Sequence, residues 1–230
     1  MDRLQVLDKG YVRLVGVMGS DLTIVNSARV SYDKQKAEMD SKDERLINFL
    51  IREGHTSPLR HASLQFEVYA PLMVARQWWK YVVGSDHTMD AWNESSRRYI
   101  SEDEQFYIPA PTEWRSKPEN SKQGSGETLK TAIGNKFTKA LMQYVEEGEQ
   151  LYNFALLNDI APEQARLFLP AYGMYVRWYW TASLQSVLHF LDQRLGHDAQ
   201  AEIQDYAIAV DAYTKAHFPA VHKAWQEHRK

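Results

Sequence analysis

Residues 62–70 alternate between apolar and polar side chains, and no other pattern constrains the fold of this chain as strongly. A period of two places successive side chains on opposite faces of a β-strand, so one face of this strand must be covered by other parts of the chain. The apolar face consists of Ala62, Leu64, Phe66, Val68 and Ala70. Residues 11–17 are rich in β-branched side chains and predict a second strand. The chain therefore needs a sheet with one covered face.

Helical patterns supply elements that can cover that face. Ser41 and Glu44 have the spacing of a capping box, and the apolar residues that follow at helical spacing run to Gly54, which predicts a helix that stops there. Residues 71–83 predict a second helix, because Pro71 suits a first turn and the residues after it are mostly apolar. Three polar side chains share one face of that helix: Arg76, Gln77 and Lys80.

The second half of the chain is mostly helical in pattern. An apolar stripe from Leu129 predicts a helix that ends at Gly148. Further helices are expected between Pro162 and Pro170, over 181–195 and over 198–216. Residues 115–127 contain no apolar side chain and predict an exposed loop. Because strands and helices are segregated, the predicted fold class is α+β, with a small antiparallel or mixed sheet and several helices in a single domain over 1–230.

Charge and composition exclude several classes of function. The chain has 230 residues with 27 basic and 30 acidic side chains, so its net charge of −3 creates no general attraction for nucleic acid. No apolar run is long enough to span a membrane, and the N-terminus has no signal-peptide profile, so a cytoplasmic protein without membrane partners is expected. The cysteine count is 0, which excludes disulfides and any mechanism with a cysteine nucleophile.

Three segments combine arginine, histidine, glutamine and serine with aromatic residues: 53–63, 75–99 and 165–204. Arginine can bind phosphate or a pyrimidine edge, and aromatic rings can support a flat heterocycle, so these segments suggest a nucleotide or flavin site. The alternative is an aromatic core surrounded by polar groups that satisfy one another. No metal site is predicted, because His55 and His61 have no partner at a zinc-binding spacing.

Two arginines have alternative explanations. Arg194 ends an apolar helical stripe, and a partly buried guanidinium needs either a ligand or an acid such as Asp192 or Asp198. Arg166 can bind a ligand or pair with Glu163 one helical turn earlier.

The segment NESSRRY (93–99), preceded by ARQWW (75–79), resembles the flavin-dependent thymidylate synthases. GHTSP, FYIP, ARLFLP and LGHDAQAEIQ resemble the same family in the same order, so the likeness runs from near residue 6 to near residue 206. The resemblance implies reductive methylation of dUMP to dTMP. The carbon would come from methylenetetrahydrofolate and the hydride from FAD reduced by NADPH. It also implies a homotetramer with active sites between subunits. The absence of cysteine agrees, because the flavin-free class of thymidylate synthase needs a cysteine nucleophile.

The resemblance also implies roles for individual residues. Arg194 would polarise the uracil ring, and the full catalytic set would be Arg194, Ser96 and His55. The residues expected to bind dUMP are Gln77, Lys80, Glu94, Ser95, Ser96, Arg97, Arg98, Arg166 and Arg194. Those expected to bind FAD are Ser57, Lys80, Tyr81, Val82, Glu94, Ser183, Gln185 and His189.

The chain departs from the family pattern in one region. Members usually have Arg-His-Arg where this chain has Lys80-Tyr81-Val82, and GSDHTMDAW is an apparent insertion before the NESSRRY motif. Two other functions therefore remain open. One is a nucleotide- or flavin-binding protein that has lost synthase activity. The other is a single-stranded nucleic acid binder, against which the net charge argues, with a stacking strip of Trp78, Trp79, Tyr81, Arg97 and Arg98.

Overall fold

A single antiparallel sheet forms the centre of the computed structural model, which describes residues 3–83, 91–95, 105–119 and 124–229. Five strands pair in the order β1-β2-β3-β5-β4 within these ranges. Their bounds are β1 Leu4–Val6, β2 Gly10–Met18, β3 Ser63–Pro71, β4 Ala91–Glu94 and β5 Tyr175–Ser183. Each neighbouring pair is antiparallel. The predicted α+β class and the two predicted strands, now β2 and β3, are confirmed.

Strand β5 corrects the sequence-based prediction of a helix over 181–195. Residues 181–183 end this strand, and the helix that follows, α6, spans Leu184–Arg194. Trp178, Trp180 and Ala182 are buried in the core, while the alternate residues Arg177 and Tyr179 are exposed. This period-two pattern was present in the sequence, but its bulky aromatic residues occur on both faces and obscure it.

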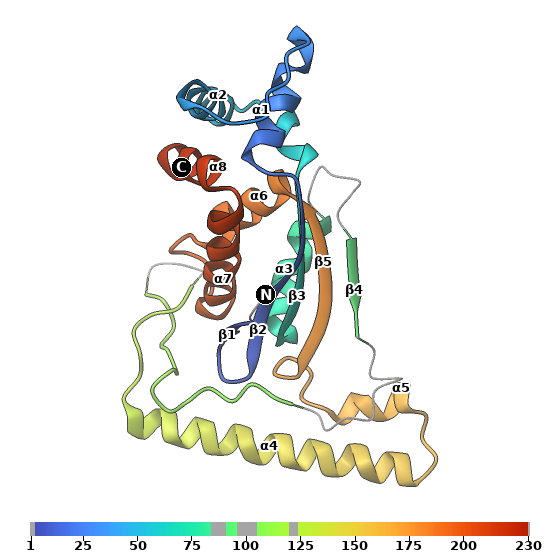
Figure 1. The fold of residues 1–230 in the computed structure, drawn as a ribbon. Helices are drawn as coiled ribbons and strands as arrows, with labels where there is room; N and C mark the ends of the chain where they lie inside the picture. Colours follow the sequence, from blue (N-terminus) through green and yellow to red (C-terminus); the bar gives the residue numbers. More distant parts are fainter. Residues whose placement is uncertain (1–2, 84–90, 96–104, 120–123, 230) are drawn as a thin grey trace.

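The covered face of the sheet packs against three helices: α3 (Leu72–Val83), α6 and α7 (Ala201–His217) (Figure 1). Trp78 of α3 is 0% exposed and stacks on Phe190 of α6, with ring centroids 4.4 Å apart. It also meets Trp178 and Trp180 edge-on. These aromatic contacts hold α3 against both the sheet and α6. The predicted helices over 71–83 and 198–216 are confirmed within a few residues.

The N-terminal helices and the last helix form a separate group at one end of the sheet (Figure 1). Helix α1 spans Asp21–Arg29, α2 spans Ser41–Arg52 and α8 spans Pro219–His228, and two short 3-10 turns cover Val30–Tyr32 and Ser57–His61. The predicted capping box at Ser41 and Glu44 is wrong by one residue, because Asp40 is the cap and accepts hydrogen bonds from the backbone of Lys42 and Asp43. Gly54 follows the helix with φ of +69°, as a stop signal requires.

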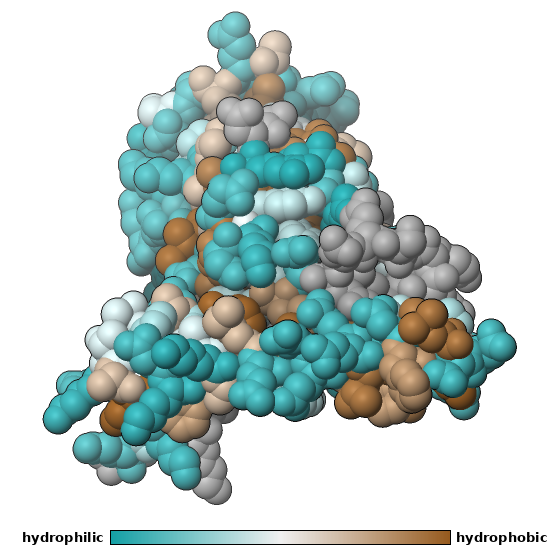
Figure 2. Space-filling view, turned by 90° about the horizontal axis from the view of Figure 1, so that it is seen from below, coloured by the Kyte–Doolittle hydropathy of each residue, from teal (hydrophilic) through white to brown (hydrophobic). Residues whose placement is uncertain are grey.

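Helix α4 (Thr131–Leu157) lies along the opposite end of the molecule and continues past Gly148, where the sequence predicted its end. Gly148 is buried because the helix passes close to Phe168 and Pro170 there. The predicted short helix after Pro162 is present as α5 (Pro162–Ala165) followed by a 3-10 turn at Arg166–Phe168. Much of the apolar side of α4 is exposed, and apolar side chains gather near its C-terminal end in Figure 2. They include Phe154, Leu157 and Leu167.

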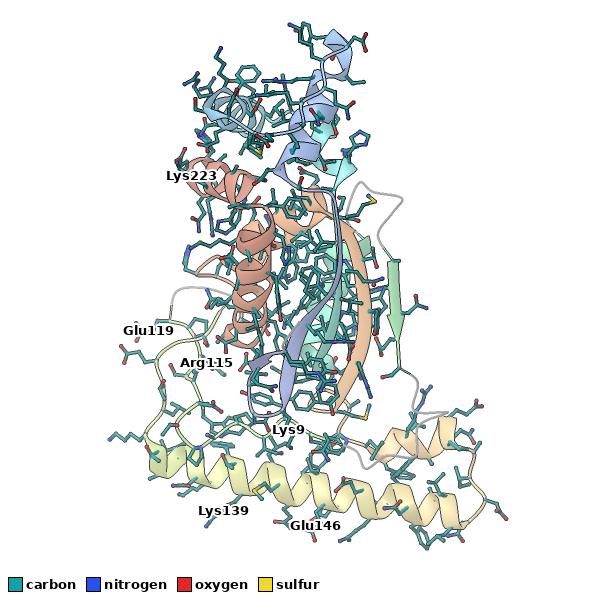
Figure 3. The ribbon with its side chains drawn as sticks, in the orientation of Figure 1. Lys9, Arg115, Glu119, Lys139, Glu146 and Lys223 are labelled. Carbon is teal, nitrogen blue, oxygen red and sulfur yellow. The ribbon has the colours of Figure 1, made fainter. Side chains whose placement is uncertain are left out.

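The described residues of the predicted exposed loop, 115–119 and 124–127, have little regular structure. Arg115 departs from that prediction, because it turns towards α7 and forms an ion pair with Glu202 (Figure 3). Glu119 points away from the body of the protein in the same view. None of the helices in the described ranges has the length and apolar character that membrane crossing requires.

Candidate functional site

The sequence-predicted site residues fall into three groups on the structure. Ser96, Arg97 and Arg98 lie outside the described residues, as do residues 84–90 of the apparent insertion. Val82 belongs to α3, but only its backbone is described. Apart from Ser57 and Ser183, the remaining residues lie at two cavities and at one cluster between α3 and α6.

Arg194 and Tyr81 form the centre of that cluster. Arg194 is the last residue of α6, where the helix dipole favours a positive charge. Its guanidinium carbon lies 4.3 Å from the centroid of the Tyr81 ring. The Nε atom is buried and has no hydrogen-bond partner in the described part of the chain. Burial lowers the pKa of Arg194, and the nearby Tyr81 and Asp198 partly oppose this shift.

The acids that could have neutralised Arg194 do not pair with it. Asp192 accepts a hydrogen bond of 2.7 Å from the indole Nε1 of Trp225. Asp198 is near enough to act through its charge, but no ion pair joins it to Arg194 in the described ranges. The geometry therefore favours the ligand alternative for this guanidinium, because a half-buried cation with no carboxylate partner among the described residues is suited to an anionic or electron-rich ligand.

Gln77 and Lys80 lie on the same helix as Tyr81. The side-chain amide of Gln77 donates to the backbone oxygen of Met73 at 3.2 Å and to the side chain of Gln200, just before α7. Lys80 is exposed. Gln77 is thus held near the Arg194 cluster, whereas the Lys80 ammonium can meet a ligand from solvent.

A cavity of about 380 Å³ lies beside this cluster, between α2, α6 and α8. It brings together three residues predicted to bind or act beside the flavin: His55, Gln185 and His189. The His189 ring also lies 5.7 Å from the Tyr81 ring, which connects the cavity to Arg194. Trp225 and Arg229 line the same cavity and were missed, since α8 was not predicted. The apolar spacing of Val221, Ala224 and Trp225 was the signal for that helix.

The two serines predicted to bind the flavin have different surroundings. Ser183 is 3% exposed, and its Oγ accepts a 3.2 Å hydrogen bond from the backbone of Ser186, so it caps α6. Ser57 is exposed at the start of the short turn that leads into β3. The exposed Ser57 can contact a ligand. At position 183, the capping of α6 is by itself a sufficient reason for a serine.

A second cavity, of about 530 Å³, collects three residues predicted to bind dUMP: Glu94, Ser95 and Arg166. Its other walls are apolar and include Leu72 and Val176. The position of Ser95 is fixed by strand pairing. Its backbone N–H donates to the carbonyl of Arg177 at 2.8 Å, and its hydroxyl accepts from the backbone N–H of Arg177 at 3.2 Å.

The charges in this second cavity are available for a ligand. Arg166 is exposed, and its Nε donates to the backbone oxygen of Glu163 at 3.2 Å, with no ion pair to the Glu163 carboxylate in the described ranges. Burial raises the pKa of Glu94, although a hydrogen bond with Trp92 opposes the shift. A guanidinium, a carboxyl group and a hydroxyl around an apolar pocket can bind a phosphate, ribose hydroxyls and a flat base.

The two cavities are at opposite ends of β5. Val176 lines one, and Gln185, just beyond the other end of the strand, lines the other. At about 3.3 Å per residue the intervening strand separates them by roughly 20–25 Å. Figure 1 shows α5 and the group of α2 and α8 at opposite ends of the molecule, in agreement. The residues predicted for one site therefore do not all converge within one chain.

The structure also bears on the nucleic acid alternative. Trp78, the first member of the proposed stacking strip, is 0% exposed and forms part of the core. Its ring cannot stack on a base, whereas Trp79 next to it is 46% exposed. No group of three or more histidine, aspartate or glutamate side chains suited to a metal ion occurs among the described residues.

Comparisons with known proteins agree over almost the whole chain. The family model described as "Thymidylate synthase complementing protein" matches residues 13–220. The flavin-dependent thymidylate synthase of Thermotoga neapolitana is 36% identical over 223 residues, covering 97% of this chain and 94% of that protein. A counterpart in Thermus thermophilus is 38% identical over 226 residues, covering 98% of this chain and 78% of that protein. Among solved structures, the UMP/dUMP methylase PolB from Streptomyces cacaoi, bound with 5-Br dUMP, has a TM-score of 0.85 and 26% identity, with 98% of each chain covered.

Proposed function

The chain belongs to the family of flavin-dependent thymidylate synthases, and from this membership we propose that it catalyses the reductive methylation of dUMP to dTMP with FAD as its cofactor. We further propose methylenetetrahydrofolate as the carbon donor and NADPH as the reductant of the flavin, because the sequence resembles the family throughout its length.

One structural observation carries the nucleotide half of this proposal. Glu94, Ser95 and Arg166 come from segments far apart in the sequence and still line one cavity. The sequence alone predicts that each of them binds dUMP. In this proposal, Arg166 binds the phosphate through charge-assisted hydrogen bonds, and Glu94 and Ser95 orient the nucleoside. Ser96, Arg97 and Arg98 follow directly in sequence and would complete the binding segment.

The first cavity has the chemical groups that a flavin requires, although one chain provides only part of a site. The imidazoles of His55 and His189 and the amide of Gln185 offer donors and acceptors for the carbonyls and ring nitrogens of an isoalloxazine. Its volume of about 380 Å³ is near the lower limit for drug-sized ligands, and a dinucleotide such as FAD is larger. We propose that His55, Ser57, Gln185 and His189 contact part of the flavin, with Lys80 near its phosphates.

Arg194 has the chemical role in this proposal. When bound, reduced FAD supplies the hydride. The guanidinium of Arg194 stabilises negative charge on the pyrimidine ring, and in a site with little water this interaction strengthens as the charge develops. The remaining binding residues hold the base against Arg194. No cysteine takes part, because the chain contains 0 cysteines.

We propose a homotetramer with active sites between subunits, since the cavities on one chain lie roughly 20–25 Å apart at the rise of a β-strand. A second copy can bring its nucleotide cavity to the flavin-side cavity of the first. The apolar side of α4 offers surface for such contacts, because Phe137, Tyr144 and Phe154 are at least half exposed.

The test is an anaerobic assay of purified protein with dUMP, methylenetetrahydrofolate, FAD and NADPH, with dTMP measured by chromatography. Production of dTMP that requires all four components is the expected result. A parallel assay with UMP asks whether the chain shares the wider substrate range that the name of PolB indicates. Flavin binding without dTMP would support the inactive binding protein. Binding of single-stranded nucleic acid by a colourless protein would support the nucleic acid alternative.

Arg194→Ala separates the catalytic role of this residue from a structural one. Loss of dTMP formation with unchanged flavin reduction and thermal stability is expected, because the side chain makes no ion pair within the described residues. Arg194→Lys should rescue poorly, since a point charge does not reproduce a planar guanidinium. Proportional loss of stability, flavin reduction and dTMP formation would contradict the catalytic role.

A further inference from the structure

The ring of Tyr81 lies beneath the guanidinium of Arg194, at a position where the family usually has histidine. The guanidinium carbon is 4.3 Å from the ring centroid, well within the range of a cation–π interaction. The described residues provide this guanidinium with no hydrogen bond and no ion pair, and its Nε is buried without a partner. Within the described part of the chain, the aromatic face is therefore the principal contact of the charged group.

The ring itself is firmly supported. Tyr81 follows Trp78 by almost one turn of α3, and Trp78 stacks on Phe190 of α6 at 4.4 Å. Tyr81 meets Phe190 edge-on, with centroids 6.4 Å apart and an interplanar angle of 77°. On the side of the cavity it lies against His189 at 5.7 Å. Two rings from α6 thus hold Tyr81 in place, and Arg194 of the same helix lies over it.

An aromatic support has a chemical advantage over an acid at this point. A carboxylate would hold the guanidinium by its N–H groups and cancel its charge. A ring face holds the flat side of the guanidinium instead, so the N–H groups in its plane stay free to donate and the positive charge stays available. That arrangement is what stabilising a negatively charged pyrimidine requires.

We propose that Tyr81 is a positioning residue for Arg194: its ring face fixes the guanidinium in the orientation that meets the substrate, without occupying its hydrogen-bond donors. The inference rests on the proposed function, because it takes Arg194 as the group that polarises the pyrimidine. It differs from the role that the resemblance implies for Tyr81, which is contact with the flavin.

Two variants test the ring separately from its hydroxyl group. Tyr81→Phe keeps the aromatic face, and turnover within about twofold of the original enzyme is expected. Tyr81→Leu removes it, and a fall in kcat of about 3- to 30-fold is expected from the usual strength of a cation–π contact, with FAD affinity within twofold. Tyr32→Leu, on a 75% exposed aromatic residue of the 3-10 turn over Val30–Tyr32, is the matched control and should behave as the original protein.

A second measurement does not depend on activity. In protein labelled with ¹⁵N at arginine Nε, the Arg194 resonance is assigned by its loss in Arg194→Lys. A ring-current displacement of that resonance should be present in the original protein and in Tyr81→Phe, and it should disappear in Tyr81→Leu. This spectrum is informative even if the protein has no synthase activity, so it distinguishes failure of the positioning role from failure of the proposed function.

Three results would overturn the inference. Equal losses of kcat in Tyr81→Phe and Tyr81→Leu would show that the hydroxyl group, not the ring, is needed. A Tyr81→Leu enzyme whose turnover is restored by saturating FAD would assign the ring to the cofactor. An Arg194 resonance that is the same in all variants would show that the guanidinium does not rest on the ring in solution.

Discussion

Replacing Gly148 with alanine should destabilise the protein, although alanine is the better helix former. In the interior of an exposed helix this substitution stabilises by about 1 kcal/mol. At Gly148, however, the new Cβ would lie 2.8 Å from the carbonyl oxygen of Phe168 and 3.0 Å from Cδ of Pro170. Both are parts of the backbone or of a rigid ring, so neither can turn aside.

The change in the free energy of unfolding is the steric cost of the new methyl group minus the gain in helix propensity. Forcing an extra methyl group into a packed contact costs about 1–3 kcal/mol, which outweighs the helix-propensity gain or cancels it. A net loss of about 0–2 kcal/mol is therefore expected. The contact can relax only if α4 and the segment from Arg166 to Pro170 move apart. Because Arg166 lines the cavity that we propose binds dUMP, its position should change and dUMP should bind more weakly.

The assay is urea unfolding followed by fluorescence, combined with calorimetric titration of dUMP. Asn135→Ala, on an exposed residue of the same helix, is the control for propensity and should raise the urea midpoint slightly. A Gly148→Ala protein whose urea midpoint rises as that of Asn135→Ala does would contradict this prediction. Such a result would mean that α4 does not rest on the Arg166 segment in solution.

Two further predictions concern stability alone. Asp21→Ala should lower the free energy of unfolding by about 2–4 kcal/mol in urea denaturation. The Asp21 carboxylate accepts hydrogen bonds from the backbone N–H groups of Ala220 and Val221, and removing it leaves these buried donors unpaired. Asp21→Asn should lower the free energy of unfolding by less. Burial, assisted by the hydrogen bond to Glu67, raises the pKa of Tyr11 to about 12 from 10.0, so the folded state favours the neutral phenol. The protonated phenol of Tyr11 therefore stabilises the folded state fully below pH 10, and this stabilisation is lost as the pH rises through 12. In Tyr11→Phe, the free energy of unfolding should fall less between pH 10 and pH 12 than in the original protein.

Regular periodicity explains why much of the fold could be predicted from the sequence. Strand β3 alternates with a period of two, and α7 carries apolar residues at helical spacing, so both were found within a few residues. Strand β5 was missed because large aromatic side chains occur on both of its faces, where Tyr179 is 40% exposed and Trp180 is 0% exposed. Local hydrophobicity cannot distinguish such a strand from a buried helix. Pairing with the neighbouring strands β3 and β4 distinguishes it.

Glycine and serine were harder to interpret, because one residue type serves several structural purposes. Gly54 stops α2 with a positive φ, whereas Gly148 remains inside α4 and permits a close approach. Both glycines follow apolar stripes in the sequence. Ser183 was predicted at the flavin, and the structure shows it capping α6. For the two glycines the difference is whether a distant part of the chain approaches the helix, which neighbouring residues in sequence do not specify. The contact of Ser183 with the flavin stays a prediction.

Strand pairing explains how Glu94 and Ser95, which we propose bind dUMP, are held in place at the end of the apparent insertion. Strand β4 pairs with β5 in a defined register, in which Ala91 is opposite Thr181 and Glu94 is opposite Trp178. Ser95 continues that register through its two hydrogen bonds to the backbone of Arg177. Val176 of β5, next to Arg177, lines the same cavity as Arg166. The sheet therefore positions Glu94 and Ser95 at this cavity. The last two residues of the apparent insertion, Ala91 and Trp92, are themselves part of β4 and pair with Thr181 and Trp180, so the insertion is compatible with this placement of the groups proposed to bind dUMP.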